Sequence, residues 1–235
     1  MDKYLIRKIF VFIVGAFIYA AGITVVKVCY LGMSPVTSVP YVISLISGIT
    51  LGTCTIYYNF VFYLIQKLVM KKEYTLKKFI IQVVLSFVFG VMIDFTGTLF
   101  GGYVPQLYPV RILYLIFGCF VLAAGMTGVV LSDFGVLPAE GTALCIKKVT
   151  GLEFGYCKIM LDVISVILSV ILSLIFLKGI MGTREGTLIS AVLVGLFAKQ
   201  VGKFIGKPIE RFLNPQISEA AVKEDIKEKI EEEVV

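Results

Sequence analysis

The sequence has no histidine and no tryptophan, and only 16% of its 235 residues are charged. Without histidine the chain has no imidazole general base, no histidine metal ligand and no histidine to ligate haem. No two of its five cysteines form a C-x-x-C pair, and most lie in or beside apolar runs, which favours a packing role. We therefore expect neither a bound metal nor a cofactor.

Motifs for nucleotide binding and hydrolysis are missing as well. The sequence contains no G-x-x-x-x-G-K-[ST], no H-E-x-x-H and no G-x-S-x-G. The acids inside apolar runs are too few and scattered to predict an acid–base pair, so an enzyme is the least favoured class. The formal net charge of +6 does not indicate nucleic-acid binding, because basic residues gather at the ends of apolar runs, where lipid headgroups lie.

Apolar sequence is abundant. The chain is 58% hydrophobic with a mean hydropathy of +0.96, whereas soluble domains are about 45–50% apolar. A helix needs about 20 apolar residues to cross a bilayer. Six such runs predict an all-α membrane protein with six transmembrane helices, at about residues 9–29, 53–70, 79–99, 112–132, 155–177 and 186–205.

The second half of the sequence repeats the first at an offset of 103 residues. The offset carries the tripeptide at 20–22 onto the one at 123–125, both Ala-Ala-Gly, and the pattern G-(x9)-G-x-x-P-(x12)-G-(x3)-G-x-C then follows in each half without a gap. We interpret this as a duplication, with a first repeat at 1–103, a second at 104–213 and a charged cytosolic tail at 214–235. The motif positions are Gly32, Pro35, Gly48 and Gly52, repeated as Gly135, Pro138, Gly151 and Gly155.

Basic residues decide the orientation of the repeats. If the short segments 35–48 and 138–151 do not cross the membrane, each half has three spans and the second half is inverted. With the N-terminus in the cytoplasm this topology places the lysines of 67–78 inside and leaves only Lys27, Arg111, Lys178 and Arg184 outside. The positive-inside rule favours it over eight spans, which would put that lysine-rich loop outside. We therefore predict six spans as two inverted three-helix repeats, with both termini cytoplasmic.

Each G-x-x-P segment interrupts the apolar sequence with glycine and proline. Such breaks are tolerated at membrane depth only where the backbone is buried in protein or lines a watery cavity. Inverted repeats with broken helices are typical of secondary transporters, whose substrate sites lie near the repeat interface. The helix N-termini after Pro35 and Pro138 would suit an anionic or polar solute. The alternative is a pair of interfacial connectors that close the ends of a helix bundle.

Polar residues within apolar runs are functional candidates. Asn59 and Asp162 are partners under the offset and would approach the midplane from opposite sides; the alternative for both is a helix-packing hydrogen bond. Lys158 is expected to extend to the inner surface. The predicted solute-binding residues are Ser34, Thr37, Ser38, Asn59, Asp94, Glu140, Thr142 and Asp162.

Three stretches resemble one known family. They are "AAGITVVKVCYLGMSPVTSVPYVIS", its echo "AAGMTGVVLSDFGVLPAEGTALCIKK" and "GTLISAVLVGLFAKQVGKFI". Over residues 8–210 the chain is similar to the YczE/YyaS/YitT-type bacterial integral membrane proteins. The resemblance implies a small protein of the bacterial cytoplasmic membrane and little about chemistry, because the family's activity is largely unassigned.

Three functions remain open from the sequence. The favoured one is a small-solute transporter or permease with a site between inverted repeats, embedded in the lipid bilayer and binding a small polar or anionic solute. The second is the substrate-binding subunit of a multi-component importer, which would need a partner subunit. The third is a non-transporting assembly or regulatory factor or a scaffold, and a homodimer is compatible with each.

Overall fold

The computed structural model describes residues 3–71, 75–152 and 154–214, with residues 224, 226, 227 and 229 of the tail. Within these residues the chain is helical and contains no strand, which confirms the all-α prediction. The helices are α1 (Lys3–Val28), α2 (Pro35–Ser47), α3 (Leu51–Met70), α4 (Leu76–Phe100), α5 (Tyr108–Leu131), α6 (Pro138–Thr150), α7 (Phe154–Leu177) and α8 (Glu185–Leu213).

Five helices in the described part of the chain are long and apolar enough to cross a membrane: α1, α4, α5, α7 and α8. The chain is therefore a multi-pass membrane protein. The sixth predicted span, 53–70, lies within α3, a helix of 20 residues. Asn59, Gln66 and three tyrosines lower its hydropathy, and its role as a span stays a prediction.

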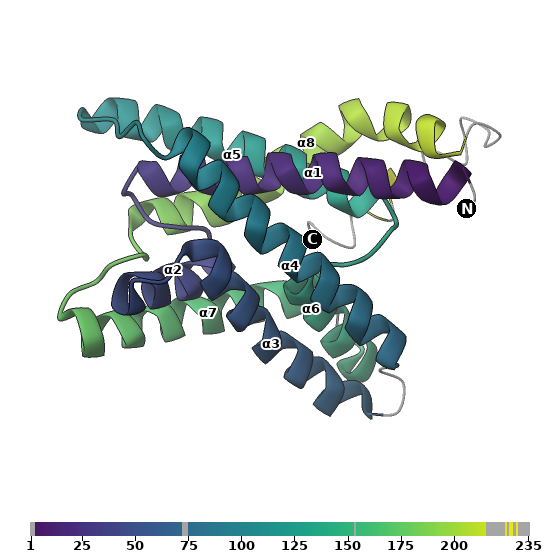
Figure 1. Ribbon diagram of the computed structural model, residues 1–235, viewed down its shortest axis with the longest axis horizontal. Coiled ribbons are helices and arrows are strands. Elements are labelled where there is room, and N and C mark those ends of the chain that lie inside the picture. The colour runs from purple at the N-terminus through teal and green to yellow at the C-terminus, as the bar shows by residue number, and fades with distance from the viewer. Residues whose placement is uncertain are drawn as a thin grey trace.

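The helices form two layers joined by α4 (Figure 1). In one layer α5 packs between α1 and α8; in the other, the short helices α2 and α6 each pack against both α3 and α7. Helix α4 packs on α1 and on α3 and so connects the layers. Helices related by the offset run in opposite directions along the long axis in Figure 1, as α1 and α5 do.

Glycines bring α1 and α5 into backbone contact. A Cβ placed on Gly22 would lie 2.4 Å from the nitrogen of Leu122, and one placed on Gly125 would lie 2.1 Å from the nitrogen of Tyr19. Small residues at a helix crossing allow this approach, which supplies van der Waals contact where lipid gives no hydrophobic drive for association. The repeated Ala-Ala-Gly therefore lies at a close contact between the two halves.

The two short helices α2 and α6 begin with the same residue type and end with the same residue type. Pro35 and Pro138 stand at the first position, where proline's missing N–H costs no hydrogen bond. Gly48 and Gly151 end the helices in the left-handed region, both with φ 71°, and donate to the carbonyls of Ser44 and Lys147. The same signals thus produce the same local structure 103 residues apart.

Three further motif glycines mark close approaches. A Cβ on Gly32 would lie 2.5 Å from Thr187 Oγ1, one on Gly52 would lie 1.9 Å from the Gly90 carbonyl oxygen, and one on Gly135 would lie 2.5 Å from Leu85 Cδ1. The surroundings of Gly155 lie outside the described residues, as does most of the predicted tail at 214–235.

Helix α2 begins deep in the molecule and returns toward the end from which it came. Its first residues, Pro35 and Val36, border the same cavity as Tyr19 in the middle of α1. Further along, Tyr41 and Leu45 border a pocket together with Lys27, Tyr30 and Arg184 at the end of the molecule.

Helix α6 has the mirrored course. The carbonyl of Pro138, at its start, accepts from Gln66 of α3, and Cys145 further along contacts Met70, the last residue of α3. Residues near the beginnings of the two short helices, Val39 and Ala139, belong to one buried cluster with Tyr58 and Phe62 of α3.

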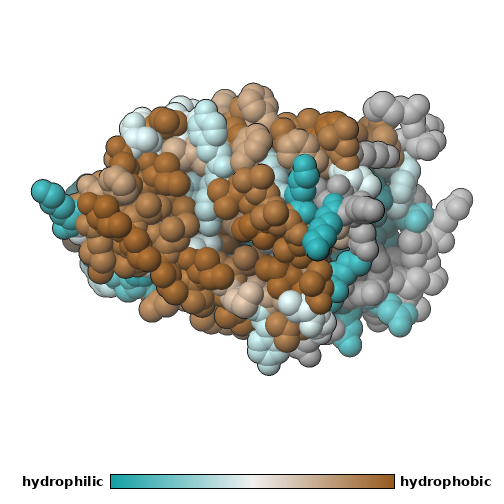
Figure 2. Space-filling view, turned by 90° about the horizontal axis from the view of Figure 1, so that it is seen from below, coloured by the Kyte–Doolittle hydropathy of each residue, from teal (hydrophilic) through white to brown (hydrophobic). Residues whose placement is uncertain are grey.

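The surface agrees with a lipid-facing protein. Figure 2 shows hydrophobic residues across most of the visible face, with hydrophilic residues gathered toward the two ends of the long axis. Many exposed side chains of α7 are large and apolar, among them Ile159, Val163, Ile167 and Ile171. An exposed apolar surface of this extent marks an interaction with membrane or protein.

Candidate functional site

A cavity of about 380 Å³ lies between the two layers. Its walls come from α1 and α5, from the first residues of α2, and from α7 and α8. Both halves of the sequence therefore contribute to it. The polar groups at its border are Ser34, Lys158, Asp162, Ser190 and Lys199.

The cavity exists because α7 and α8 diverge (Figure 1). In the first half the corresponding helices, α3 and α4, pack closely at Gly52 and Gly90. There Leu85, Phe89 and Ile93 of α4 fill the space between the layers as part of a large buried cluster. Among the described residues α8 packs on α5 but does not lie along α7 in that way, and the space stays open.

Three charged side chains meet at one edge of this cavity. Lys158 Nζ lies 3.5 Å from Glu140 Oε1 and 3.7 Å from Asp162 Oδ1. The side chain of Glu140 is only 6% exposed, and those of Lys158 and Asp162 are 22% and 24% exposed. We call Glu140, Lys158 and Asp162 the charged triad. Oδ1 of Asp162 is buried and has no hydrogen-bond partner within the described structure.

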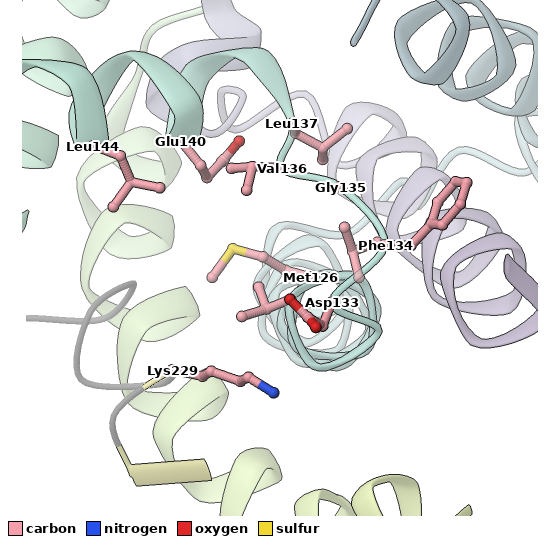
Figure 3. Close-up of a pocket in the computed structure, with 11 residues that line it drawn as sticks. Met126, Asp133, Phe134, Gly135, Val136, Leu137, Glu140, Leu144 and Lys229 are labelled. Carbon is pink, nitrogen blue, oxygen red and sulfur yellow. The ribbon is translucent and has the colours of Figure 1, made fainter. Parts of the chain in front are cut away.

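Glu140 borders a second cavity, of about 290 Å³ (Figure 3). It belongs to the first turn of α6, where the positive end of the helix dipole favours a carboxylate. Asp133 and Lys229 border the same cavity from other segments, and Met126 borders both cavities. The charged triad therefore lies between two cavities, with Glu140 on one and Asp162 on the other.

Asn59 belongs to a polar network between α3 and α4. Its Nδ2 donates to Ser86 Oγ at 2.9 Å, Ser86 also contacts the hydroxyl of Tyr63, and that hydroxyl donates to the Gln82 carbonyl at 2.7 Å. All four side chains are buried. Hydrogen bonds of this kind fix how two membrane helices pack.

Thr142 and Gln66 join α3 to α6. Gln66 Nε2 donates to the Pro138 carbonyl at 2.9 Å and to Thr142 Oγ1 at 3.2 Å, and Thr142 in turn donates to the same carbonyl at 2.8 Å. Thr142 and Gln66 are fully buried, at 0% and 2% exposure. This junction holds the beginning of α6, and therefore Glu140, in place.

The hydroxyls at the start of α2 bond locally. Thr37 and Ser38 donate to the carbonyls of Ser34 and Pro35 at 3.0 and 2.6 Å, and both are buried. Ser34 lies 2.5 Å from the Thr37 hydroxyl and borders the 380 Å³ cavity.

Asp94 binds at the N-terminus of α3 and does not border the 380 Å³ cavity. Its carboxylate accepts from the Gly52 N–H at 2.7 Å and from the Thr50 hydroxyl at 2.6 Å. Thr50 is the N-cap of α3. The carboxylate therefore satisfies a donor of the first turn and complements the helix dipole.

The structure thus gathers some predicted residues and separates others. It brings Glu140 and Asp162 together through Lys158, and it places Ser34 on the same cavity as Asp162. Asn59, Asp94, Thr37, Ser38 and Thr142 bond to other partners within the protein.

Lys158 was expected to extend to the inner surface, and that stays a prediction; in the structure its ammonium group lies between the carboxylates of Glu140 and Asp162. Its spacing of four residues from Asp162, which puts both on one helix face, was the available signal. Gln66, whose bonds position α6, was not predicted at all.

No cluster of three or more His, Cys, Asp or Glu side chains that could hold a metal ion occurs in the part of the chain that the structure describes. No curated protein and no solved structure matches the sequence. One family does match, over residues 6–203, and it is described as a family of unknown function, DUF6198. The resemblance to the YczE/YyaS/YitT type is not confirmed by that name. Because the match covers most of its length, the chain belongs to the family DUF6198.

Proposed function

We propose that this protein is a small-solute transporter of the bacterial cytoplasmic membrane, with six spans in two inverted three-helix repeats. Both termini lie in the cytoplasm, and α2 and α6 enter the membrane from opposite sides without crossing it. The solute is small and polar or anionic. It binds in the 380 Å³ cavity between the two halves.

The opposite directions of the related helices support the inverted arrangement (Figure 1). So do the matching ends of α2 and α6, and the fact that each helix returns toward its own end of the molecule. Transporters built in this way carry their solute near the repeat interface. The cavity lies at that interface, since α1 and α5 both border it.

The observation that carries the proposal is the buried oxygen of Asp162. Lys158 Nζ lies 3.7 Å from this oxygen, an ion-pair distance, but the oxygen accepts no hydrogen bond within the described structure, which is costly in a low-dielectric interior. The residue Asp162 borders a cavity far larger than a single water, which occupies about 30 Å³ of liquid. A solute that donates a hydrogen bond to the Asp162 carboxylate satisfies it, and Lys158 of α7 and Lys199 of α8, which both border the cavity, provide positive charge for an acidic group.

The different packing of the corresponding helices in the two halves supports a transport cycle in which these helices move. Helix α4 is closed on α3, whereas α8 stands apart from α7. Two copies of one unit therefore hold two different helix arrangements. Exchange of these arrangements between the halves would open the cavity alternately to the two sides, as transport requires.

Thermal unfolding of the purified chain in detergent, with a panel of small polar and anionic solutes, tests the proposal. A solute at 100 times its dissociation constant stabilises the folded protein by about 2.7 kcal/mol. We expect at least one solute to raise the melting temperature of the wild type and not that of Asp162→Asn. The matched control is Glu185→Gln, which neutralises a half-exposed carboxylate outside the cavity.

Uptake of the same solute into proteoliposomes then separates transport from binding alone. Uptake by the isolated chain supports the transporter. Binding without uptake, together with co-purification of an ATPase, favours the importer subunit instead. If no solute in the panel stabilises the wild type, the protein is better explained as a non-transporting factor.

A further inference from the structure

The charged triad carries more charge than it can neutralise. Its two carboxylates and one ammonium group have a net charge of −1 when all three are ionised. A net charge enclosed by protein within a membrane is costly, and carboxylates in such positions are typical of proton relays. One proton bound to either carboxylate would make the group neutral.

Lys158 can form an ion pair with either of the two carboxylates. Its distances to Glu140 and Asp162, 3.5 and 3.7 Å, are nearly equal. Both exceed the length of about 2.7–2.9 Å that a charge-assisted hydrogen bond takes. The ammonium group is therefore shared between the two acids, and a small movement of its flexible side chain would pair it with one of them.

The two acids face different cavities. Glu140 borders the 290 Å³ cavity (Figure 3). Lys158 and Asp162 border the 380 Å³ cavity of the proposed solute site. Each cavity can hold several waters at about 30 Å³ each. A proton can therefore reach Glu140 from one cavity and leave Asp162 into the other.

We propose that the charged triad is a proton-binding site that couples solute movement to a proton gradient. This inference rests on the proposed function. A proton from water in the smaller cavity binds the Glu140 carboxylate, and Lys158 then pairs with Asp162. In the next step Lys158 donates a proton to Asp162 and takes the proton of Glu140, so the ammonium is restored and the Asp162 carboxyl is neutral. Asp162 finally releases the proton to the larger cavity.

Other titratable and charged groups lie near the charged triad and contribute to the electrostatic potential at its carboxylates. Tyr58 of α3 lies near enough to Asp162 to interact with it electrostatically. Four more border the two cavities: Tyr19, Asp133, Lys199 and Lys229. Apart from Asp133, none of these is a carboxylate, and Asp133 pairs with Lys8. We therefore assign the proton to Glu140 and Asp162.

Infrared titration of the purified protein, without any solute, tests proton binding directly. As the pH is lowered we expect uptake of about one proton per chain, seen in the carbonyl band of a protonated carboxyl group. Glu140→Gln and Asp162→Asn should each abolish this step, because the remaining acid then forms a neutral pair with Lys158. Lys158→Gln should act in the opposite direction and move the titration to higher pH, since two carboxylates remain without a cation.

Asp133→Asn is the control and should retain the step. If Glu140→Gln or Asp162→Asn retains the wild-type titration, or if Lys158→Gln leaves it unmoved, the proton site is wrong.

Solute uptake separates this inference from the proposed function. In proteoliposomes the ratio of uptake with a pH gradient to uptake without one should exceed unity for the wild type and fall to unity in Glu140→Gln. A variant that keeps the wild-type ratio overturns the coupling while transport stands. If the triad titrates as expected but no solute is bound or moved, the proposed function fails instead.

Discussion

The carboxylate of Asp94 in α4 accepts the backbone N–H of Gly52 in α3 at 2.7 Å. At this point the two helices are so close that a Cβ on Gly52 would lie 1.9 Å from the Gly90 carbonyl oxygen. A charged residue within an apolar run, which the sequence marks as a candidate for binding, thus ties the beginning of one helix to its neighbour.

Replacement of Asp94 tests this structural role. Asp94→Ala should lower the free energy of unfolding by about 1–2 kcal/mol, the usual cost of a lost helix cap. Unfolding in detergent measures it, with Thr98→Ala as control, because Thr98 is exposed and bonds only within its own helix. Unchanged stability combined with a lost response to solute would instead make Asp94 a binding residue.

The crossing of α1 and α5 should be intolerant of a single methyl group. A Cβ on Gly125 would meet the backbone of Tyr19 at 2.1 Å, so Gly125→Ala should destabilise the fold by about 1–3 kcal/mol or more. Gly97, in α4, has nothing within 4 Å, and Gly97→Ala should be neutral or stabilising by a few tenths of a kcal/mol. Melting temperatures of the two variants in the same detergent give the comparison. Equal effects would mean that the helices do not touch at Gly125.

The protein should lose the same amount of folding stability when either of the two glycines that end the short helices is replaced by alanine. Gly48 and Gly151 both have φ 71° and nothing within 4 Å of a Cβ, so only backbone strain opposes alanine. Each substitution should cost about 1–2 kcal/mol, and the two values should agree. Gly102→Ala, in open space without a positive φ, is the control. A large difference between Gly48→Ala and Gly151→Ala would contradict the shared local structure.

Cysteine labelling at three sites decides the membrane topology. All five native cysteines are buried and should react slowly with an impermeant reagent. Tyr103→Cys lies outside in the six-span topology and inside in an eight-span one. Ile180→Cys lies outside and Leu152→Cys lies inside in both, and all three positions are exposed. We expect Tyr103→Cys to label from outside in intact cells; labelling only after lysis would support eight spans.

The local elements were accessible from the sequence because their causes are local. All eight predicted segments are helical, with ends within about four residues of those expected except at α1, which begins at Lys3, and at α8, which continues to Leu213. Proline and glycine at repeated positions also predicted where α2 and α6 begin and end. Such signals depend on backbone angles and on hydropathy over single turns, which neighbours in the chain determine.

The candidate site was only partly accessible. Asp162 and Glu140 could be selected because an ionised group in an apolar run needs a partner wherever the chain folds. Asn59 was selected on the same ground, yet it bonds to Ser86 on the next helix. The sequence could not distinguish these cases, because the partner is chosen by packing.

The sequence by itself determined an all-helical membrane protein, the start and end of each short helix, and the motif that recurs at an offset of 103 residues, since all of these follow from hydropathy and from signals along the chain. Only the tertiary structure decided that Lys158 lies between Glu140 and Asp162, and that α8 stands apart from α7 and leaves a cavity. The physical reason is that side chains distant in sequence meet only when α6 and α7 pack, and residue order does not specify the angle at which they do so.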